Sequence, residues 1–140
     1  MLTRWILLPF LLTIWQGEKI AHTDSEWREL LGEKRYSVMR KKGTEAPLLG
    51  ALEKEGTYLC AACELPLFHS INKYNSGSLW PNFTKPIYPK NVYYLEDWSM
   101  GFKRYEVLCS RCDSHLGHIF RDSPDHFRYC INSIALIIKS

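Results

Sequence analysis

This 140-residue chain lacks a strong charge of either sign. Lysine and arginine number 18 against 15 acidic residues, which gives a formal net charge of +3. Its most basic stretch is only "MRKKG" at residues 39–43, which is ordinary for a solvated surface. Because nucleic-acid binding needs clustered basic side chains, we expect no nucleic-acid partner. Low-complexity tracts are also missing, and the only repeated unit is CxxC, so this length indicates one domain.

The chain also lacks an apolar run long enough to span a bilayer, which takes about 20 residues. Residues 5–15 are mostly apolar, follow Arg4 and contain Pro9. A basic residue before a short apolar run is typical of a secretory leader, although no A-x-A-like cleavage triplet follows. We therefore predict a hydrophobic leader or anchor over residues 1–20, a folded domain over residues 21–140, and an exported or membrane-anchored protein. The alternatives are a buried N-terminal segment of the domain and a cytoplasmic protein.

Two kinds of local pattern follow the apolar run. Thr23 and Glu26 form a capping box ahead of a helix that Gly32 should end, and a second short helix is expected up to Gly43. From Thr57 onward, short β-branched and aromatic runs alternate with Gly, Pro, Asn and Ser, which predicts many short antiparallel strands. The expected fold is mainly β, with short helices first.

Four of the five cysteines form two CxxC pairs, namely Cys60, Cys63, Cys109 and Cys112. A two-residue gap lets both sulfurs of a turn face one ion, and two such pairs are typical of a structural tetrathiolate zinc site. Residues 64–108 separate the pairs, so one zinc ion per chain would join two distant hairpins. Two disulfides or two redox-active dithiols are the alternatives, and an exported protein would favour the disulfides.

The fifth cysteine, Cys130, lies in the strand-like segment "FRYCINSIALII". In a strand, Arg128 and Asn132 would share its face, while Tyr129 and Ile131 would point the other way. A cation beside a thiol favours the thiolate, which is the nucleophilic form. The pattern predicts the wall of a reactive site, and the alternative is an inert core cysteine.

Two further segments carry candidate site residues. His115 and His118 follow the second CxxC pair and could transfer protons near neutral pH, although single histidines are often structural. In "NSGSLWPNF", Trp80 and Phe83 could form an aromatic wall for a small apolar group or a plain hydrophobic plug. Asn82 begins "NFT", a glycosylation triplet that is common by chance.

Several motifs, in this order, resemble those of the B-type methionine sulfoxide reductases: "KGTEAPLLG", "GTYLCAACELPLF", "SGSLWPNF", "RYEVLCSRCDSHLGHIF" and "RYCINSIAL". The resemblance runs from Lys42 to the end of the chain. It implies a β-tent of two antiparallel sheets with short N-terminal helices and a structural zinc. The implied activity is reduction of methionine R-sulfoxide, free or in oxidised proteins under repair, with thioredoxin or another thiol as reductant. We expect a monomer.

By this resemblance, Cys130 is the catalytic cysteine that attacks the sulfoxide sulfur and becomes a sulfenic acid. Trp80 cradles the methyl group of the substrate, and His115 and His118 bind and protonate the sulfoxide oxygen.

The resemblance also implies supporting residues. Arg128 and Asn132 flank and tune the nucleophile, Asp122 is an acidic helper near His118, and Phe120 is a pocket aromatic.

Two features depart from the family pattern. No cysteine lies between Cys63 and Cys109 or before Cys60, where many members carry a resolving cysteine, so a one-cysteine route of recycling is predicted. Leu79 stands where glycine usually precedes the tryptophan, and leucine adopts a positive φ at a cost, which predicts a reshaped loop.

Two other functions remain open at this point. A zinc-ribbon binding module would explain the CxxC pairs but not the polar face that includes Cys130. A related β-tent could also serve another purpose, because a fold does not define a function.

Overall fold

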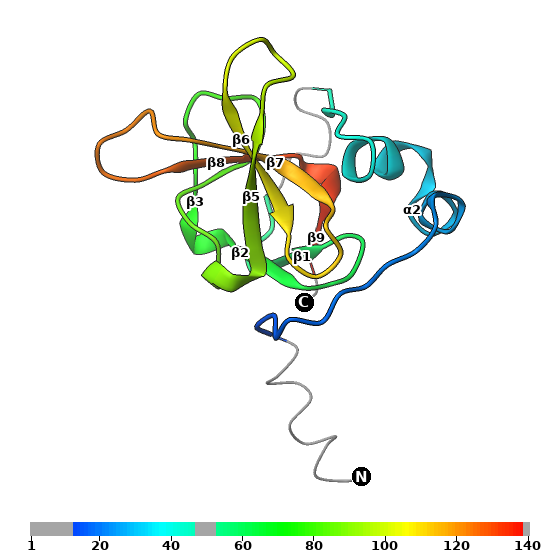
Figure 1. The fold of residues 1–140 in the computed structure, drawn as a ribbon. Coiled ribbons are helices and arrows are strands. Elements are labelled where there is room, and N and C mark those ends of the chain that lie inside the picture. The colour runs from blue at the N-terminus through cyan, green and yellow to red at the C-terminus, as the bar shows by residue number, and fades with distance from the viewer. Residues whose placement is uncertain (1–12, 47–52, 139–140) are drawn as a thin grey trace, which may run out of the picture.

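The computed structural model of the chain describes residues 13–46 and 53–138 (Figure 1). Within these residues one α-helix, α2 (Asp24–Met39), precedes the strands β1 (Thr57–Cys60), β2 (Pro66–His69), β3 (Lys73–Tyr74), β4 (Asn82–Phe83), β5 (Val92–Asp97), β6 (Arg104–Cys109), β7 (His115–Phe120), β8 (Arg128–Ile131) and β9 (Leu136–Ile138). Three short 3-10 helices connect them: η1 (Ser70–Asn72), η2 (Pro89–Asn91) and η3 (Ser133–Ala135).

Helix α2 begins and bends where its sequence predicts. The Thr23 hydroxyl accepts a hydrogen bond from the Glu26 backbone N–H at 3.2 Å, and the Glu26 carboxylate accepts one from Thr23 N–H at 2.8 Å. Gly32 interrupts the helix with a φ of 77°, so α2 consists of two short helices joined at a kink. After it, Gly43 N–H donates to the Ser37 carbonyl at 3.0 Å.

The strands form two antiparallel sheets, as expected. One has the order β2-β1-β9 and the other β3-β4-β8-β7-β6-β5. Phe68 of β2 stacks on Phe83 of β4 at 4.6 Å and meets Tyr129 of β8 edge-on at 5.7 Å. These contacts pack the small sheet against the large one, which confirms the predicted mainly-β architecture.

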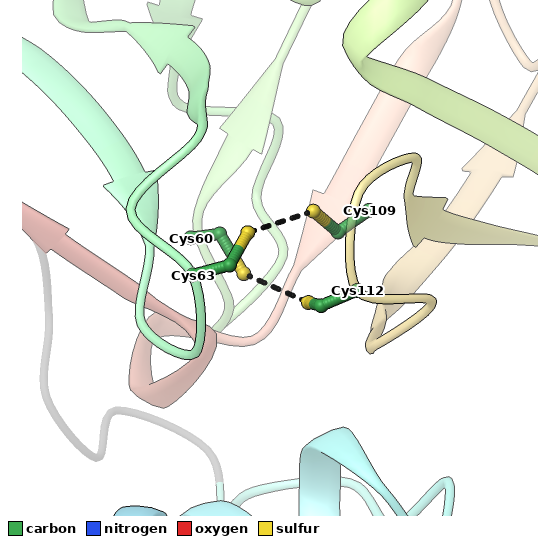
Figure 2. A group of neighbouring side chains, drawn as sticks. All are labelled: Cys60, Cys63, Cys109 and Cys112. Atoms are coloured by element: carbon green, nitrogen blue, oxygen red, sulfur yellow. Dashed lines mark hydrogen bonds between the residues drawn. The ribbon is translucent and has the colours of Figure 1, made fainter. Parts of the chain in front are cut away.

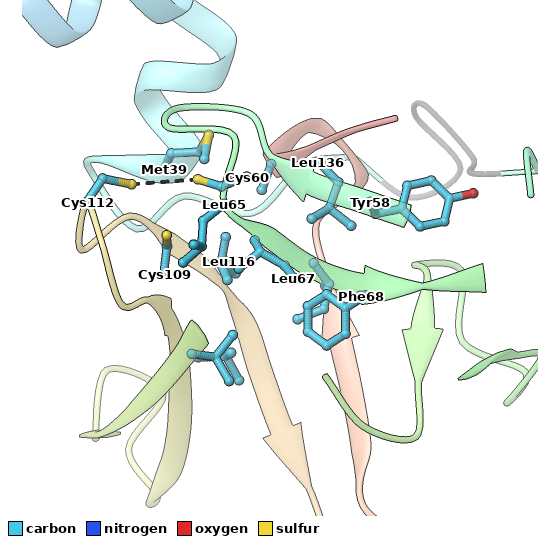
Figure 3. Close-up of a cluster of buried hydrophobic side chains, with 14 of the residues drawn as sticks. Met39, Tyr58, Cys60, Leu65, Leu67, Phe68, Cys109, Cys112, Leu116 and Leu136 are labelled. Atoms are coloured by element: carbon cyan, nitrogen blue, oxygen red, sulfur yellow. Dashed lines mark hydrogen bonds between the residues drawn. The ribbon is translucent and has the colours of Figure 1, made fainter. Parts of the chain in front are cut away.

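The core fills the space between the sheets and reaches α2 (Figure 3). It includes buried side chains from both sheets, from the turn between β1 and β2, and from the helix: Met39, Tyr58, Leu65, Leu67, Phe68, Leu116 and Leu136. Trp27 is also buried, and Arg35 of α2 donates to the Ile134 carbonyl at 2.9 Å. The helix thus covers the edge of the fold beside η3.

Part of the predicted leader lies within the described structure. Residues 13–20 pack on the β body, where Trp15 N–H donates to Asn91 Oδ1 at 2.8 Å and Ile20 N–H donates to the Arg111 carbonyl at 2.8 Å. Residues 1–12, which hold most of the predicted leader, lie outside the described residues. Among the helices in the described ranges, none has the length and apolar character needed to cross a membrane.

Candidate active site and metal centre

Cys130 lies in β8 at the centre of the large sheet. It pairs with Asn82 of β4 on one side and with His118 of β7 on the other. Tyr129 and Ile131 are buried in the core, whereas Arg128 and Cys130 are partly exposed on the opposite face. The alternation predicted from the sequence is confirmed, and it presents the thiol on the face away from the core.

The neighbouring strand approaches unusually closely at Gly117. A Cβ atom at this position would lie 2.0 Å from the Cys130 carbonyl oxygen, so only glycine fits between β7 and β8. The "HLGH" segment therefore brings the His118 backbone beside Cys130.

The loop before β4 forms the other wall of the site. Trp80 is held by a hydrogen bond of 3.1 Å from its indole nitrogen to the Glu45 carbonyl. Gly77 supplies the positive φ of this loop at 87°, and Leu79 has a negative φ. The loop therefore needs no left-handed leucine, and Leu79 instead presents a half-exposed side chain to the cavity.

Cys130 opens into a cavity of about 490 Å³. Its lining joins three loops and the strands β6, β7 and β8: Thr44, Gly77, Ser78, Leu79, Trp80, Arg104, Gly117, His118, Phe120, Arg128, Cys130, Ile131 and Asn132. The structure thus gathers six of the predicted site residues around one cavity: Trp80, His118, Phe120, Arg128, Cys130 and Asn132.

His118 is anchored by a carboxylate that sequence reasoning missed. Its Nε2 lies 2.7 Å from Asp97 Oδ2, and Arg104 pairs with the same oxygen at 3.4 Å. Burial lowers the pKa of His118 below its ordinary value, the bond to Asp97 raises it in part, and the charges of Arg104 and His115 lower it. The bond to His118 and the bonds from Ser99 hold the pKa of Asp97 well below its usual range.

His115 lies behind this cavity and does not line it. The side chain is 2% exposed, its Nδ1 lies 2.7 Å from Glu106 Oε2, and its ring meets the His118 ring edge-on at 5.4 Å. Burial opposes ionisation of Glu106, but the bond to His115 and the charge of Lys42 lower its pKa overall. The prediction that His115 contacts substrate is corrected accordingly, because its placement is that of a support behind His118.

Asp122 also differs from its predicted role. Its Oδ2 accepts a hydrogen bond from Arg128 Nε at 2.8 Å, while the acidic partner of His118 is Asp97. Arg128 in turn stacks over the Phe120 ring at 4.4 Å. Asp122 therefore holds Arg128, two residues from Cys130, and does not contact His118.

The prediction that Phe83 binds substrate is wrong. The strand alternation turns Phe83 into the core, where it is 0% exposed and stacks on Phe68. Asn82 is buried as well, and its Nδ2 donates to the Trp80 carbonyl at 2.8 Å, so the folded chain does not offer it for glycosylation.

Asn132 and Glu45 fix the rear of the site. Asn132 Oδ1 accepts from the Glu45 N–H at 3.0 Å, and its Nδ2 donates to the Leu116 carbonyl at 3.1 Å. The Glu45 carboxylate accepts hydrogen bonds from the backbone N–H groups of Ser133 and Ile134 at the start of η3. One buried residue therefore connects the Trp80 loop to the end of β8.

Burial raises the pKa of the Cys130 thiol above its ordinary value. Ser78, whose hydroxyl oxygen lies 3.8 Å from the sulfur, and the positive charge of Arg128 both oppose this shift. The expectation that Arg128 favours the thiolate is correct in direction, but burial outweighs it.

The two CxxC turns have the same backbone geometry. In each, the residue after the second cysteine adopts a positive φ, 65° at Glu64 and 61° at Asp113. Each also closes a hydrogen bond back to the first cysteine, from Glu64 to Cys60 at 2.8 Å and from Asp113 to Cys109 at 2.9 Å. This turn aims both sulfurs of a pair to one side.

The turns bring four sulfurs together from the two sheets (Figure 2). All four lie within 4.8 Å of one another, and Cys60–Cys112 and Cys63–Cys109 are separated by 3.6 Å and 3.5 Å. Zn–S bonds of about 2.3 Å place tetrahedral sulfurs about 3.8 Å apart, so this cluster fits a tetrahedral metal ion. Disulfides need about 2 Å and are not formed among the described cysteines.

The match to known proteins is extensive. A family model described as the SelR domain matches residues 31–140. The chain belongs to the SelR (MsrB) family. A curated relative from Pseudomonas putida, named peptide methionine sulfoxide reductase MsrB, is 46% identical over 127 residues, which cover 87% of this chain and 96% of the relative. A relative of the same name from Alteromonas mediterranea is 44% identical over 129 residues, which cover 89% of this chain and 89% of the relative. Another from Leptospira interrogans is 46% identical over 123 residues, which cover 84% of this chain and 94% of the relative.

Family membership confirms the resemblance stated from the motifs, and the matched region contains the cavity and the cysteine cluster. Asp97, Arg104, Glu106, Glu45 and Ser78 are the site residues that sequence reasoning missed. Glu106 did carry a signal, since it is a carboxylate inside the apolar strand "YEVLC". The others have no local pattern, because their roles depend on contacts between distant segments.

Proposed function

We propose that this chain reduces methionine R-sulfoxide, free or within polypeptides, to methionine. One observation carries the proposal: Cys130 opens into a cavity between the indole of Trp80 and the carboxylate-bound His118. An aromatic wall suits the S-methyl group, and a histidine on the opposite side suits the sulfoxide oxygen. Relatives named peptide methionine sulfoxide reductase MsrB support the assignment.

The Cys130 sulfur attacks the sulfoxide sulfur, and His118 supplies a proton as negative charge develops on the oxygen. In the net reaction, sulfoxide and thiol become thioether and sulfenic acid, so the oxygen atom passes to Cys130 and the sulfur of methionine is reduced. Sulfenic acid is the first reversible stage of cysteine oxidation.

Asp97 orients His118 for this step. Because Asp97 is ionised and its Oδ2 lies 2.7 Å from His118 Nε2, the carboxylate keeps a proton on Nε2. The other ring nitrogen, Nδ1, is not bound by Asp97. The same carboxylate stabilises the imidazolium form of His118. Arg104, which lines the cavity, pairs with Asp97 and keeps the carboxylate in place behind His118.

An external thiol then reduces the sulfenic acid, and thioredoxin or a similar reductant fills this role. The support is the cysteine arrangement, since the other four cysteines form the metal cluster and a serine, Ser78, faces Cys130. Attack by the first external thiol releases water and forms a mixed disulfide, and a second thiol frees Cys130.

The metal cluster would hold one structural zinc ion in Cys60, Cys63, Cys109 and Cys112. Four thiolates close a tetrahedral site and leave no position for substrate. Because Cys60 ends β1 and Cys109 ends β6, the ion would join the small sheet to the large one.

The protein acts as a monomer in the repair of oxidised proteins. The apolar run at residues 5–15 directs the chain to export or holds it at a membrane. The support for export is the leader-like pattern after Arg4. Mass spectrometry of the mature protein from its host tests this, because an intact Met1 on a soluble cytosolic product would contradict export.

The activity test uses the R and S epimers of N-acetyl-methionine sulfoxide with dithiothreitol as reductant. Wild type should consume the R epimer alone, and Cys130→Ser should consume neither while it retains its fold and its metal. Failure of folded, zinc-loaded wild type to consume either epimer would leave a binding module as the better account.

A further inference from the structure

The connection between β5 and β6 carries three large apolar side chains that nothing in the proposed chemistry uses. Trp98, Met100 and Phe102 are 60%, 63% and 57% exposed. We call these three residues the hairpin tip, and Figure 1 shows this connection projecting from the body of the protein. Scattered apolar residues are common on surfaces, but three on one short turn form a patch typical of a contact site.

The turn that carries the hairpin tip is held in one conformation by hydrogen bonds. Asp97 Oδ1 accepts from the Ser99 N–H at 2.9 Å, and Gly101 N–H donates to the Trp98 carbonyl at 3.0 Å. Gly101 has a φ of +83°, which a larger residue would adopt only under strain. The hydrogen bonds of Ser99 and Gly101 hold the turn, and with it the apolar side chains, away from the core.

The base of this hairpin is also part of the candidate active site. Asp97 binds His118, and Arg104 lines the cavity that contains Cys130. Two other connections also carry exposed apolar side chains: Leu79, which lines the cavity, is 51% exposed, and Phe127, one residue before β8, is 40% exposed. The hairpin tip is therefore connected to the substrate site through the two residues at its base, Asp97 and Arg104.

We propose that the hairpin tip is a docking surface for apolar residues that flank the methionine sulfoxide in an extended polypeptide. This inference rests on the proposed function and names the form of substrate that the site favours. Methionine is an apolar residue of protein cores, and its oxidation introduces a polar group that disrupts them. A segment released in this way carries apolar neighbours beside the sulfoxide.

The dimensions of the sheet fit this arrangement. β5 lies three strands from β8 in the large sheet. The strand pairing places Leu95 of β5 in the row of Cys130. With strands about 4.8 Å apart, Leu95 lies about 14 Å from Cys130, and Trp98 lies about 10 Å further along the chain. The direct separation is then about 17 Å, and because an extended peptide rises about 3.3 Å per residue, the tip would meet residues about five positions from the sulfoxide.

Charge favours a peptide over an anionic partner. Asp97 and Arg104 at the hairpin base pair with each other at 3.4 Å, and Lys103, whose ammonium lies over the Tyr105 ring at 5.5 Å, is the one charged residue between them. An anionic membrane surface or a nucleic acid would call for several basic side chains at the contact.

The test compares kcat/KM for three R-sulfoxide substrates. One is N-acetyl-methionine sulfoxide amide, the second is a peptide with Leu and Phe four and five positions from the sulfoxide, and the third has Ser at those positions. Wild type should prefer the apolar peptide at least tenfold, mainly through KM. Combined Trp98→Ser, Met100→Ser and Phe102→Ser should abolish the preference and leave turnover of the small substrate within twofold. Leu30→Ser, at a 63% exposed site on α2, is the matched control and should keep the preference.

A wild type without preference, or a triple variant that keeps it, would overturn the proposal. Binding to phosphatidylcholine–phosphatidylglycerol vesicles that depends on the tip, without a peptide preference, would equally overturn it in favour of a membrane. If wild type turns over no substrate, the proposed function fails by itself. Fluorescence anisotropy of the labelled apolar peptide with wild type and triple variant then decides the docking surface, since tighter binding by wild type supports it and equal binding refutes it.

Discussion

Replacement of Asp97 by asparagine should slow the chemical step about 30-fold. The carboxylate lies 2.7 Å from His118 Nε2, and the two side chains are only 4% and 13% exposed. Asparagine keeps an oxygen that can accept the bond from Ser99, but it has no charge and can offer its NH₂ group to the histidine. His118 then loses its ionic partner and can shift its ring proton to the other nitrogen.

The magnitude follows from the bond that is lost. A hydrogen bond to a charged group contributes about 1.5–3 kcal/mol, and this one is shielded from water. About 2 kcal/mol corresponds to a roughly 30-fold lower kcat, because each 1.36 kcal/mol changes a rate tenfold. The KM for a small sulfoxide should change little, since Asp97 itself does not line the cavity.

The assay is steady-state turnover of N-acetyl-methionine R-sulfoxide by Asp97→Asn, with Glu96→Gln as the control on the exposed face of the same strand. Urea unfolding of both variants separates loss of catalysis from loss of fold. If folded Asp97→Asn keeps kcat within threefold, or loses only KM, Asp97 does not orient His118.

Four further results are expected. Burial lowers the pKa of His118 and raises the pKa of Cys130 from their ordinary values, so kcat/KM should be flat over the pH range between the two pKa values. It should fall in acid, where His118 and the Cys130 thiol are both protonated, and in base, where both have lost the proton; a sharp optimum near pH 7 would contradict this. The Ser78→Cys variant should form a disulfide with Cys130 after one turnover, because the Ser78 oxygen is 3.8 Å from the Cys130 sulfur. Intact-protein mass spectra should show the loss of two hydrogens in this variant and not in wild type. Cys112→Ser should reduce bound zinc from about one ion per chain to well below one and lower the melting temperature, and unchanged metal content would refute the four-thiolate site. Phe83→Ala should reduce the free energy of unfolding by about 3–5 kcal/mol, since its ring is fully buried, and a loss of activity without a loss of stability would restore its predicted role in substrate binding.

The cluster of four cysteines and the face that carries Cys130 could be predicted from local spacing. A CxxC turn is a short-range structure, so its two sulfurs converge whatever the rest of the chain does, and the two-residue repeat of a strand puts Arg128 and Cys130 on one face. The capping box at Thr23 and Glu26 is equally local, and it forms as expected.

The partners of those residues depend on tertiary structure. Asp97 reaches His118 only because β5 and β7 both flank β6, and the bulge between Val107 and Leu108 sets the register of β6 against β7. Likewise, the direction of Phe83 is fixed by the two-residue strand β4, whose alternation turns one residue to the core and the next away from it. A sequence records which side chains are available and how near neighbours will face. Which carboxylate meets which histidine, and which aromatic ring is buried, is decided by pairing between segments far apart in the chain, because those contacts have no short-range repeat to reveal them.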